Sequence, residues 1–292
     1  MGAVITGIAR TAIGRFSGSL SSLRAVDLGA SAIEGALDRS GLEPDKVDEV
    51  IFGQVLQAGE GQITSRVAAT RAGVPMTVPA ITINKVCLSG LAAIGLADRS
   101  IRLGESSFVV AGGMESMSNA PHVLKELRAG SRLGDATLVD VMLHDGLFCA
   151  FDQCTMGESS DLKNRQLGIS REEQDEWSAA SHARTITATE SGAFADEIVP
   201  VTIPQRKGDA VVFDTDEGVR AGTTSETLGR LRPAFVDDGT ITAGNASQIS
   251  DGGAAVVAAD RGAAEAAGLP ILAEVVAYGQ IGGRDATLHE RP

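Results

Sequence analysis

The feature that most constrains the fold is an apolar helix that follows a short strand and a cysteine. Residues 80–83 read as a strand, and leucine, isoleucine and alanine cover almost every face of the segment at 88–97. A helix that is apolar all round belongs between two layers of structure. Cys87 is predicted to stand on the first turn of this helix, where small neighbours, Ser89 and Gly90, leave room around the sulfur.

The first 118 residues alternate between strand and helix patterns. Strands are predicted at 4–8, 50–52, 80–83 and 108–111. A helix with apolar positions four, three and four residues apart is predicted to end at Gly41, and a second helix is predicted at 66–72. This alternation favours a parallel sheet that is covered by helices.

The alternation breaks down between residues 119 and 243, where Pro, Gly and charged residues increase. One helix is clear there: Ser170 and Glu173 form a capping box, Trp177 is predicted to anchor its apolar side, and Gly192 ends it. The run at 254–258 then predicts a core strand.

Composition and charge exclude several classes of function. A net charge of −13 argues against nucleic acid or an anionic membrane as the main partner. Three cysteines are too few, and odd in number, for a disulfide framework, so a reducing compartment is expected. No basic and apolar leader opens the sequence, and no apolar run is long enough to span a bilayer. We therefore expect a cytoplasmic protein.

Cys87 can be interpreted in two ways from residue types alone. A helix N-terminus favours a thiolate over a thiol, which would make Cys87 a nucleophile for acyl transfer. A cysteine in an apolar run is more often a buried structural residue. His182 has no partner at metal-ligand spacing, so no metal site is expected.

Four blocks of sequence decide between these alternatives. They are Asn-x-x-Cys-x-Ser-Gly at 84–90, Ala-Gly-Gly-Met-Glu-Ser-Met-Ser at 111–118, Leu-Arg-Pro-Ala-Phe at 231–235 and Thr-Ala-Gly-Asn-Ala-Ser at 242–247. In order and spacing they resemble the thiolase family, and most closely its acetoacetyl-CoA thiolases (acetyl-CoA C-acetyltransferases). The resemblance runs from the first residues to about Ala277.

The resemblance implies an α/β, thiolase-like layered fold with one βαβαβ half and an inserted loop domain. It implies an N-terminal domain at 1–118 and 244–270, a coenzyme A-binding loop domain at 119–243, and the start of a C-terminal domain at 271–292. The family's Asn-Glu-Ala-Phe, Gly-His-Pro and Cys-x-Gly-Gly segments do not occur in the 292 residues. We therefore expect the second half to be missing and part of the helix at 88–97 to be uncovered.

The resemblance assigns Cys87 as the residue acylated by a thioester, with its backbone N–H in an oxyanion hole. In the family a histidine activates this cysteine, and a second cysteine deprotonates acetyl-CoA. The implied enzyme is an acyltransferase of fatty acid metabolism that forms or cleaves acetoacetyl-CoA. Coenzyme A and acetyl-CoA are its substrates, no cofactor is covalently bound, and a homo-oligomer (dimer or tetramer) is expected.

The aligned blocks also imply contacts to coenzyme A. Ser247 would hydrogen-bond the pantetheine arm, and Arg220 would lie near the nucleotide end. The channel would be lined by Ala243, Phe235, Leu147 and Met156. Without the resemblance, Ser247 reads as a turn hydroxyl, Phe235 and Met156 as core residues, and Arg220 as a solvated charge.

One departure from the family lies in this region. Many acetoacetyl-CoA thiolases have His-Met-Gly where this chain has Thr-Met-Gly at 155–157, so Thr155 replaces a histidine that contacts the acyl-CoA. No motif supports Cys149 or Cys154 as the missing base, and both are expected to be inert packing thiols.

Two classes of function follow. The first is the N-terminal and loop portion of an acetoacetyl-CoA thiolase, with negligible condensing activity in the isolated chain. The alternative is a non-catalytic, CoA-binding thiolase-like module that needs a partner chain. A ketoacyl synthase of related fold is disfavoured by the Gly-Gly-Met-Glu-Ser-Met block at 112–117 and by the length of the loop domain.

Overall fold

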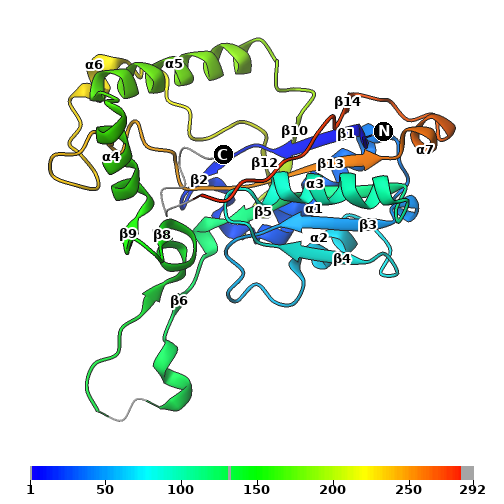
Figure 1. Ribbon diagram of the computed structural model, residues 1–292, viewed down its shortest axis with the longest axis horizontal. Coiled ribbons are helices and arrows are strands. Elements are labelled where there is room, and N and C mark those ends of the chain that lie inside the picture. Colours follow the sequence, from blue (N-terminus) through cyan, green and yellow to red (C-terminus); the bar gives the residue numbers. More distant parts are fainter. Residues whose placement is uncertain (1, 131–132, 284–292) are drawn as a thin grey trace. The chain divides into compact units, whose positions relative to one another are not determined.

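The computed structural model describes residues 2–130 and 133–283, and these form two compact units (Figure 1). The first unit contains residues 2–122, 195–217 and 249–279, and the second contains residues 123–130, 133–194, 218–248 and 280–283. The predicted family domains, 1–118 with 244–270, 119–243 and 271–292, stay a prediction. So does the absence of a second half.

The first unit is built on one mixed sheet, whose main strands lie in the order β10-β1-β13-β5-β3-β4. Strand β3 pairs in parallel with both β4 and β5, as the alternation of strands and helices predicts. Strand β13 runs antiparallel between β1 and β5, which the alternation did not predict. Two short strands extend the sheet, β14 on β1 and β2 on β13. The bounds are β1 (Val4–Thr11), β2 (Gly14–Arg15), β3 (Glu49–Gly53), β4 (Ala80–Ile83), β5 (Phe108–Ser116), β10 (Ile198–Val199), β13 (Ser250–Ala259) and β14 (Ala273–Glu274).

Helices cover both faces of this sheet (Figure 1). Because side chains alternate along a strand, Val50 and Phe52 face the core under α1 and α2, while Ile51 lies in the core under α3. Helix α1 ends at Gly41, whose φ of +72° fits the predicted glycine stop. The helices of this unit are α1 (Ala25–Ser40), α2 (Thr64–Arg71), α3 (Ser89–Leu103) and α7 (Arg261–Ala266).

Helix α3 is the apolar helix predicted from the sequence. Ala93 and Ala97 are fully buried in the core that α3 forms with the sheet, while Leu91 is 60 % exposed. Elsewhere on α3, the Tyr278 ring packs against Gly95 and the Arg99 guanidinium lies 5.3 Å from the centre of that ring. Part of α3 is thus uncovered in the described residues, as expected.

The second unit is mainly helical. Helix α5 begins at the predicted cap, where the Ser170 hydroxyl accepts the Glu173 N–H at 3.1 Å and the Glu173 carboxylate accepts the Ser170 N–H at 2.8 Å. The prediction that Trp177 anchors an apolar side is wrong. Trp177 is 70 % exposed, and its ring carries the Arg184 guanidinium at 5.7 Å. The main elements of the second unit are α4 (Met156–Leu167), α5 (Arg171–Glu190), α6 (Ser225–Gly229), β8 (Phe148–Cys149) and β9 (Cys154–Thr155).

The remaining elements are short. They are the strands β6 (His122–Val123), β7 (Val139–Asp140), β11 (Val201–Ile203) and β12 (Val211–Phe213), four 3₁₀ turns at Ser19–Ser22, Pro44–Lys46, Met117–Asn119 and Lys125–Ala129, and a π-helical turn at Met142–Leu147. Among residues 2–130 and 133–283, no helix combines the length and the apolar character needed to cross a membrane.

Candidate active site

Cys87 lies in the five-residue connection between the edge strand β4 and helix α3. It is exposed, so it is not the buried structural cysteine that residue types left open. It also lies just before the helix rather than on its first turn, because α3 begins at Ser89 with Leu88 as its N-cap. The sequence prediction of the strand was confirmed, and the prediction of the cysteine's position was wrong by two residues.

The backbone makes a sharp turn immediately before Cys87. Val86 has a φ of +50°, in the left-handed region that a β-branched residue rarely adopts. Such a conformation persists only where surrounding contacts hold it, and it is typical of functional sites. We refer to residues 84–89 as the elbow.

Two side chains hold the elbow in this shape. The Ser89 hydroxyl, nearly buried, accepts the Lys85 N–H at 2.8 Å and donates to the Val86 carbonyl at 2.6 Å. The Asn84 side-chain carbonyl accepts the Val86 N–H at 2.9 Å. Both backbone polar groups of the strained residue are therefore bonded, and its conformation is fixed from two sides.

Gly53 lets the sheet approach the elbow closely. It ends β3, where it pairs with Ile83 and Gly113. A Cβ atom at residue 53 would stand 2.5 Å from the Cβ of Ser89, closer than side chains can pack. Sequence reasoning missed this residue, because a glycine at a strand end gives no sign of what lies beside it.

In the second unit, Phe235 lies against the start of α4. A Cβ atom at Gly157 would come within 2.3 Å of the Phe235 ring, so only glycine allows this contact. Gly157 follows Met156, and Phe235 itself is 40 % exposed. The structure thus places Phe235 against the residue that follows Met156, another residue predicted to line the coenzyme A channel.

Ala243 lies on a tight turn that follows the Phe235 segment, and Ser247 lies just after this turn; both residues are exposed. A bridge joins Pro233 to Thr242, and the Ala234 N–H donates to the Ile241 carbonyl at 2.8 Å. Because the bridge is antiparallel, Phe235 lies beyond one end of it and Ala243 beyond the other.

Two buried carboxylates anchor this turn to the helices. The Asp161 side chain of α4 accepts the N–H groups of Thr240 and Ile241 at 2.6 and 3.0 Å. The Asp175 side chain of α5 accepts from the Asn245 amide at 2.8 Å. Neither carboxylate was singled out from the sequence, since acidic residues on helices are usually solvated.

Leu147 precedes the β8–β9 hairpin and Met156 follows it, and Phe148 pairs with Thr155. Thr155, which stands where many relatives have histidine, is the N-cap of α4. Its hydroxyl accepts the Glu158 N–H at 3.3 Å and donates to the Glu158 carboxylate at 2.8 Å. The Thr155 backbone N–H also donates to this carboxylate, at 2.6 Å, and this bond, followed by the one from the hydroxyl, lowers the pKa of Glu158.

Arg220 lies on an exposed loop that packs against α5. Its backbone N–H donates to His182 Nδ1 at 3.3 Å, so His182 carries its proton on the other ring nitrogen if it is neutral. No described contact joins Arg220 to Phe235 or Ser247. Sequence reasoning considered His182 only as a metal ligand and rejected that role, and its part as a hydrogen-bond acceptor was missed.

Cys149 and Cys154 face each other across the β8–β9 hairpin, and neither forms a disulfide. Cys149 is buried and accepts the Asp152 N–H at 3.4 Å. Loss of hydration raises the pKa of the Cys154 thiol, and the negative charges of Asp152 and Glu158 raise it further. Burial limits access to the Cys149 sulfur, and the raised pKa of Cys154 favours its unreactive thiol form, as expected from the sequence.

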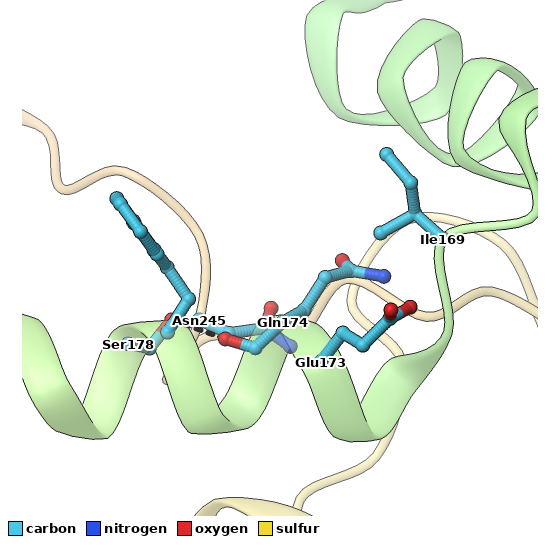
Figure 2. A pocket seen from close by; sticks show the side chains of 6 residues that line it. Ile169, Glu173, Gln174, Ser178 and Asn245 are labelled. Carbon is cyan, nitrogen blue, oxygen red and sulfur yellow. Dashed lines mark hydrogen bonds between the residues drawn. The ribbon is translucent and has the colours of Figure 1, made fainter.

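A pocket of about 250 Å³ lies on α5 (Figure 2). Figure 2 shows Glu173, Gln174 and Ser178 projecting from the helix, with Asn245 from a separate loop and Ile169 from the segment that precedes α5. None of the residues predicted to contact coenzyme A lines it. Within residues 2–130 and 133–283, no group of three or more histidine, cysteine and acidic side chains is arranged to hold a metal ion.

Known proteins resemble this chain over most of its length. The family described as "Thiolase, N-terminal domain" matches residues 3–262. A probable acetyl-CoA acetyltransferase of Mycolicibacterium smegmatis is 52 % identical over 284 residues, which are 97 % of this chain and 73 % of the relative. An acetyl-CoA acetyltransferase of Pseudomonas aeruginosa is 50 % identical over 279 residues, 96 % of this chain and 71 % of that protein.

A solved structure gives the same result. The crystal structure of the Bacillus anthracis acetyl-CoA acetyltransferase superposes with a TM-score of 0.90 at 43 % sequence identity, covering 93 % of this chain and 68 % of that one. Agreement in sequence and in structure over this extent shows that the chain belongs to the thiolase family.

Proposed function

We propose that this protein is an acetyl-CoA acetyltransferase whose Cys87 takes up the acetyl group during formation or cleavage of acetoacetyl-CoA. The observation that carries the proposal is the exposed cysteine on a strained, doubly held elbow. It stands in a chain that is about half identical to proteins named acetyl-CoA acetyltransferases.

The proposed first step is a thioester exchange. The Cys87 thiolate attacks the carbonyl carbon of acetyl-CoA and forms a tetrahedral oxyanion, which backbone N–H groups would stabilise. The bond from that carbon to the coenzyme A sulfur then breaks. Coenzyme A leaves as a thiolate that takes up a proton from water, and the acetyl group stays on Cys87 as a new thioester.

Condensation is proposed as a second step. The carbanion of a second acetyl-CoA would attack the acetyl group, forming a carbon–carbon bond and returning the Cys87 thiolate. This step needs a base that removes a proton from the methyl group. The family resemblance assigns that role to a second cysteine.

We propose that coenzyme A contacts the second unit through Ser247, Ala243, Phe235, Leu147, Met156 and Arg220. The exposed positions of Ser247 and Arg220 and the partial exposure of Phe235 support this, because a ligand can reach them. Arg220 offers a fixed positive charge for a phosphate of the nucleotide end.

The second candidate function is a non-catalytic, CoA-binding thiolase-like module that acts only with a partner chain. This candidate predicts binding of acetyl-CoA with no transfer of the acetyl group.

We also propose a cytoplasmic homo-oligomer, as the family resemblance implies. The 60 % exposed Leu91 on α3 supports association between chains. Light scattering on the purified protein tests it, and a monomer at high concentration would contradict it.

Isotope exchange tests the proposed acyl transfer. If an acetyl-enzyme forms, radiolabelled coenzyme A should enter the acetyl-CoA pool without any net reaction, because the thioester exchange is reversible. Unlabelled acetyl-CoA, labelled coenzyme A and the purified protein are the only components needed. Binding of acetyl-CoA without label exchange would favour the non-catalytic module and contradict the enzyme.

A further inference from the structure

Strand β5 continues past the end of its neighbour β3. The last pair between the two strands is Gly53 with Gly113, so the Glu115 side chain reaches the loop that follows β3. Its carboxylate accepts the Val55 N–H at 2.8 Å and the Leu56 N–H at 3.2 Å. Glu115 therefore fixes the path of this loop with two hydrogen bonds.

The same loop is bonded to the elbow. The Asn84 side-chain amide donates to the Val55 carbonyl at 3.3 Å, and its carbonyl accepts the Val86 N–H at 2.9 Å. An unbroken series of hydrogen bonds thus runs from the Glu115 carboxylate through Val55 and Asn84 to Val86, the residue before Cys87. Neither Glu115 nor Val55 touches Val86 in this series, so Asn84 is the link.

Glu115 is an unfavourable residue to place at this position. Burial raises the pKa of its carboxyl, and the carboxylates of Glu60 and Asp251 raise it further, against the lowering by the two backbone hydrogen bonds. Asp251 is fully buried, and one of its carboxylate oxygens has no hydrogen-bond partner among the described residues. A carboxyl kept among other buried carboxyls contributes little to stability by its charge, which points to a role in geometry.

We propose that Glu115 is a positioning residue for Cys87, acting through the Val55 carbonyl and Asn84 to hold Val86 in its left-handed conformation. The inference rests on the proposed function, in which Cys87 is the acylated residue. Glu115 does not take part in the chemistry. It keeps Asn84 in the one orientation that bonds both the loop and the elbow.

The first test compares two glutamates of the sheet. Glu115→Gln keeps the shape but replaces one acceptor oxygen by an NH₂ group that faces a backbone N–H. We expect the saturating rate of coenzyme A exchange to fall about tenfold or more, with the KM for acetyl-CoA within about twofold, because misplacement affects the reacting sulfur and leaves the binding residues intact. Glu49→Gln, at the opposite end of β3 where Glu49 accepts from Ser100, should change neither value.

The second test asks whether the effect travels through Asn84. Asn84→Asp retains an acceptor for Val86 and removes the donor to Val55. If the series is real, the double variant with Glu115→Gln should lose no more activity than the more damaged single variant. Amide hydrogen exchange, measured by NMR, should also show the Val86 N–H exchanging about tenfold faster in Glu115→Gln, although Glu115 does not touch it.

The outcomes separate the two proposals. Additive losses in the double variant, or an unchanged Val86 amide in Glu115→Gln, would overturn the positioning role, as would a full exchange rate. If the wild-type protein exchanges no labelled coenzyme A, the proposed function fails, and the Val86 amide still decides whether Glu115 orders the elbow. If Glu115→Gln does not fold, the Val86 amide of Asn84→Asp decides it: protection equal to wild type contradicts the series, and loss of protection supports it.

Discussion

The cysteines of this chain lie in two opposite kinds of surroundings. One is the elbow, which contains Cys87, and the other is the β8–β9 hairpin, which contains Cys149 and Cys154. Cys87 is exposed beside a residue in a rare backbone conformation, with the backbone on either side held by buried or hydrogen-bonded side chains. Cys149 is buried in regular strand pairing, and the pKa of Cys154 is raised by loss of hydration and by neighbouring negative charge.

The comparison shows that the chain constrains different groups in the two regions. At the elbow, hydrogen bonds fix the backbone and leave the sulfur accessible, which suits a nucleophile. At the hairpin, Cys149 is buried, and the raised pKa of Cys154 favours its protonated thiol. The hydrogen bonds that fix the backbone there belong to the cap of α4 that follows. We therefore expect the elbow to control acyl transfer and the hairpin segment to control binding.

The largest expected effect is that of removing the Cys87 thiol, with removal of the Cys154 thiol as its control. Cys87→Ala should lower coenzyme A exchange by about a thousandfold or more, since it removes the acylated atom. Cys154→Ala should leave the rate within about twofold, because no described contact of its sulfur involves a proposed substrate group. Radiolabel exchange measures both, and comparable losses in the two variants would break the contrast.

A smaller effect is expected at the support of the elbow. Ser89→Ala removes the acceptor for Lys85 N–H and the donor to the Val86 carbonyl, so the exchange rate should fall by about tenfold or more through misplacement of Cys87. The matched control is Ser100→Ala, farther along α3, whose hydroxyl bonds Glu49 and Ser106.

Thermal unfolding separates stability from positioning in this pair. Each variant should lose roughly 1–2 kcal/mol of unfolding free energy. Equal exchange rates at equal stability loss would show that the elbow needs no support from Ser89.

The binding side of the comparison is tested at the first turn of α4. In Gly157→Ala the new Cβ would collide with the Phe235 ring, so this ring must move. We expect the KM for acetyl-CoA to rise by about threefold to tenfold, with iodoacetamide labelling of Cys87 unchanged. Gly229→Ala, which meets no atom within 4 Å, is the control. A fall in Cys87 labelling in Gly157→Ala would contradict the division of roles.

The smallest effect concerns the charge around Cys154. Because its pKa is raised, the Cys154 thiolate forms only at a higher pH than the thiolate of an ordinary cysteine. The rate of Cys154 alkylation should therefore begin to rise at a higher pH than that of a free thiol. Asp152→Asn removes one negative neighbour and lowers that pKa, so labelling at pH 8 should rise by about twofold at most, because lost hydration is the larger cause. A fall in labelling would contradict the assigned sign.

Much of the first unit follows from sequence pattern alone. Three elements lie within one or two residues of their predicted bounds: the strands at 50–52 and 80–83 and the helix that ends at Gly41. The spacing of apolar residues and a glycine that ends a helix are local signals, which a sequence shows directly. The antiparallel course of β13 is a long-range property, since it depends on β1 and β5 far away in the chain.

The candidate site was predictable in part. A motif identified Cys87, but the left-handed conformation of Val86 contradicts the preference of its own residue type and is imposed by Asn84 and Ser89. Trp177 was misplaced for the opposite reason. Its size predicts burial, yet α5 has only one buried residue, Asp175, so no apolar core lies there to receive the ring.

Peptide mapping after incubation with acetyl-CoA tests the central claim most directly. The account predicts an added acetyl group on the peptide that contains Cys87, removed again by excess coenzyme A, with Cys149 and Cys154 unmodified. An acetyl group spread evenly over the three cysteines, or found on Cys154 and not on Cys87, would contradict it.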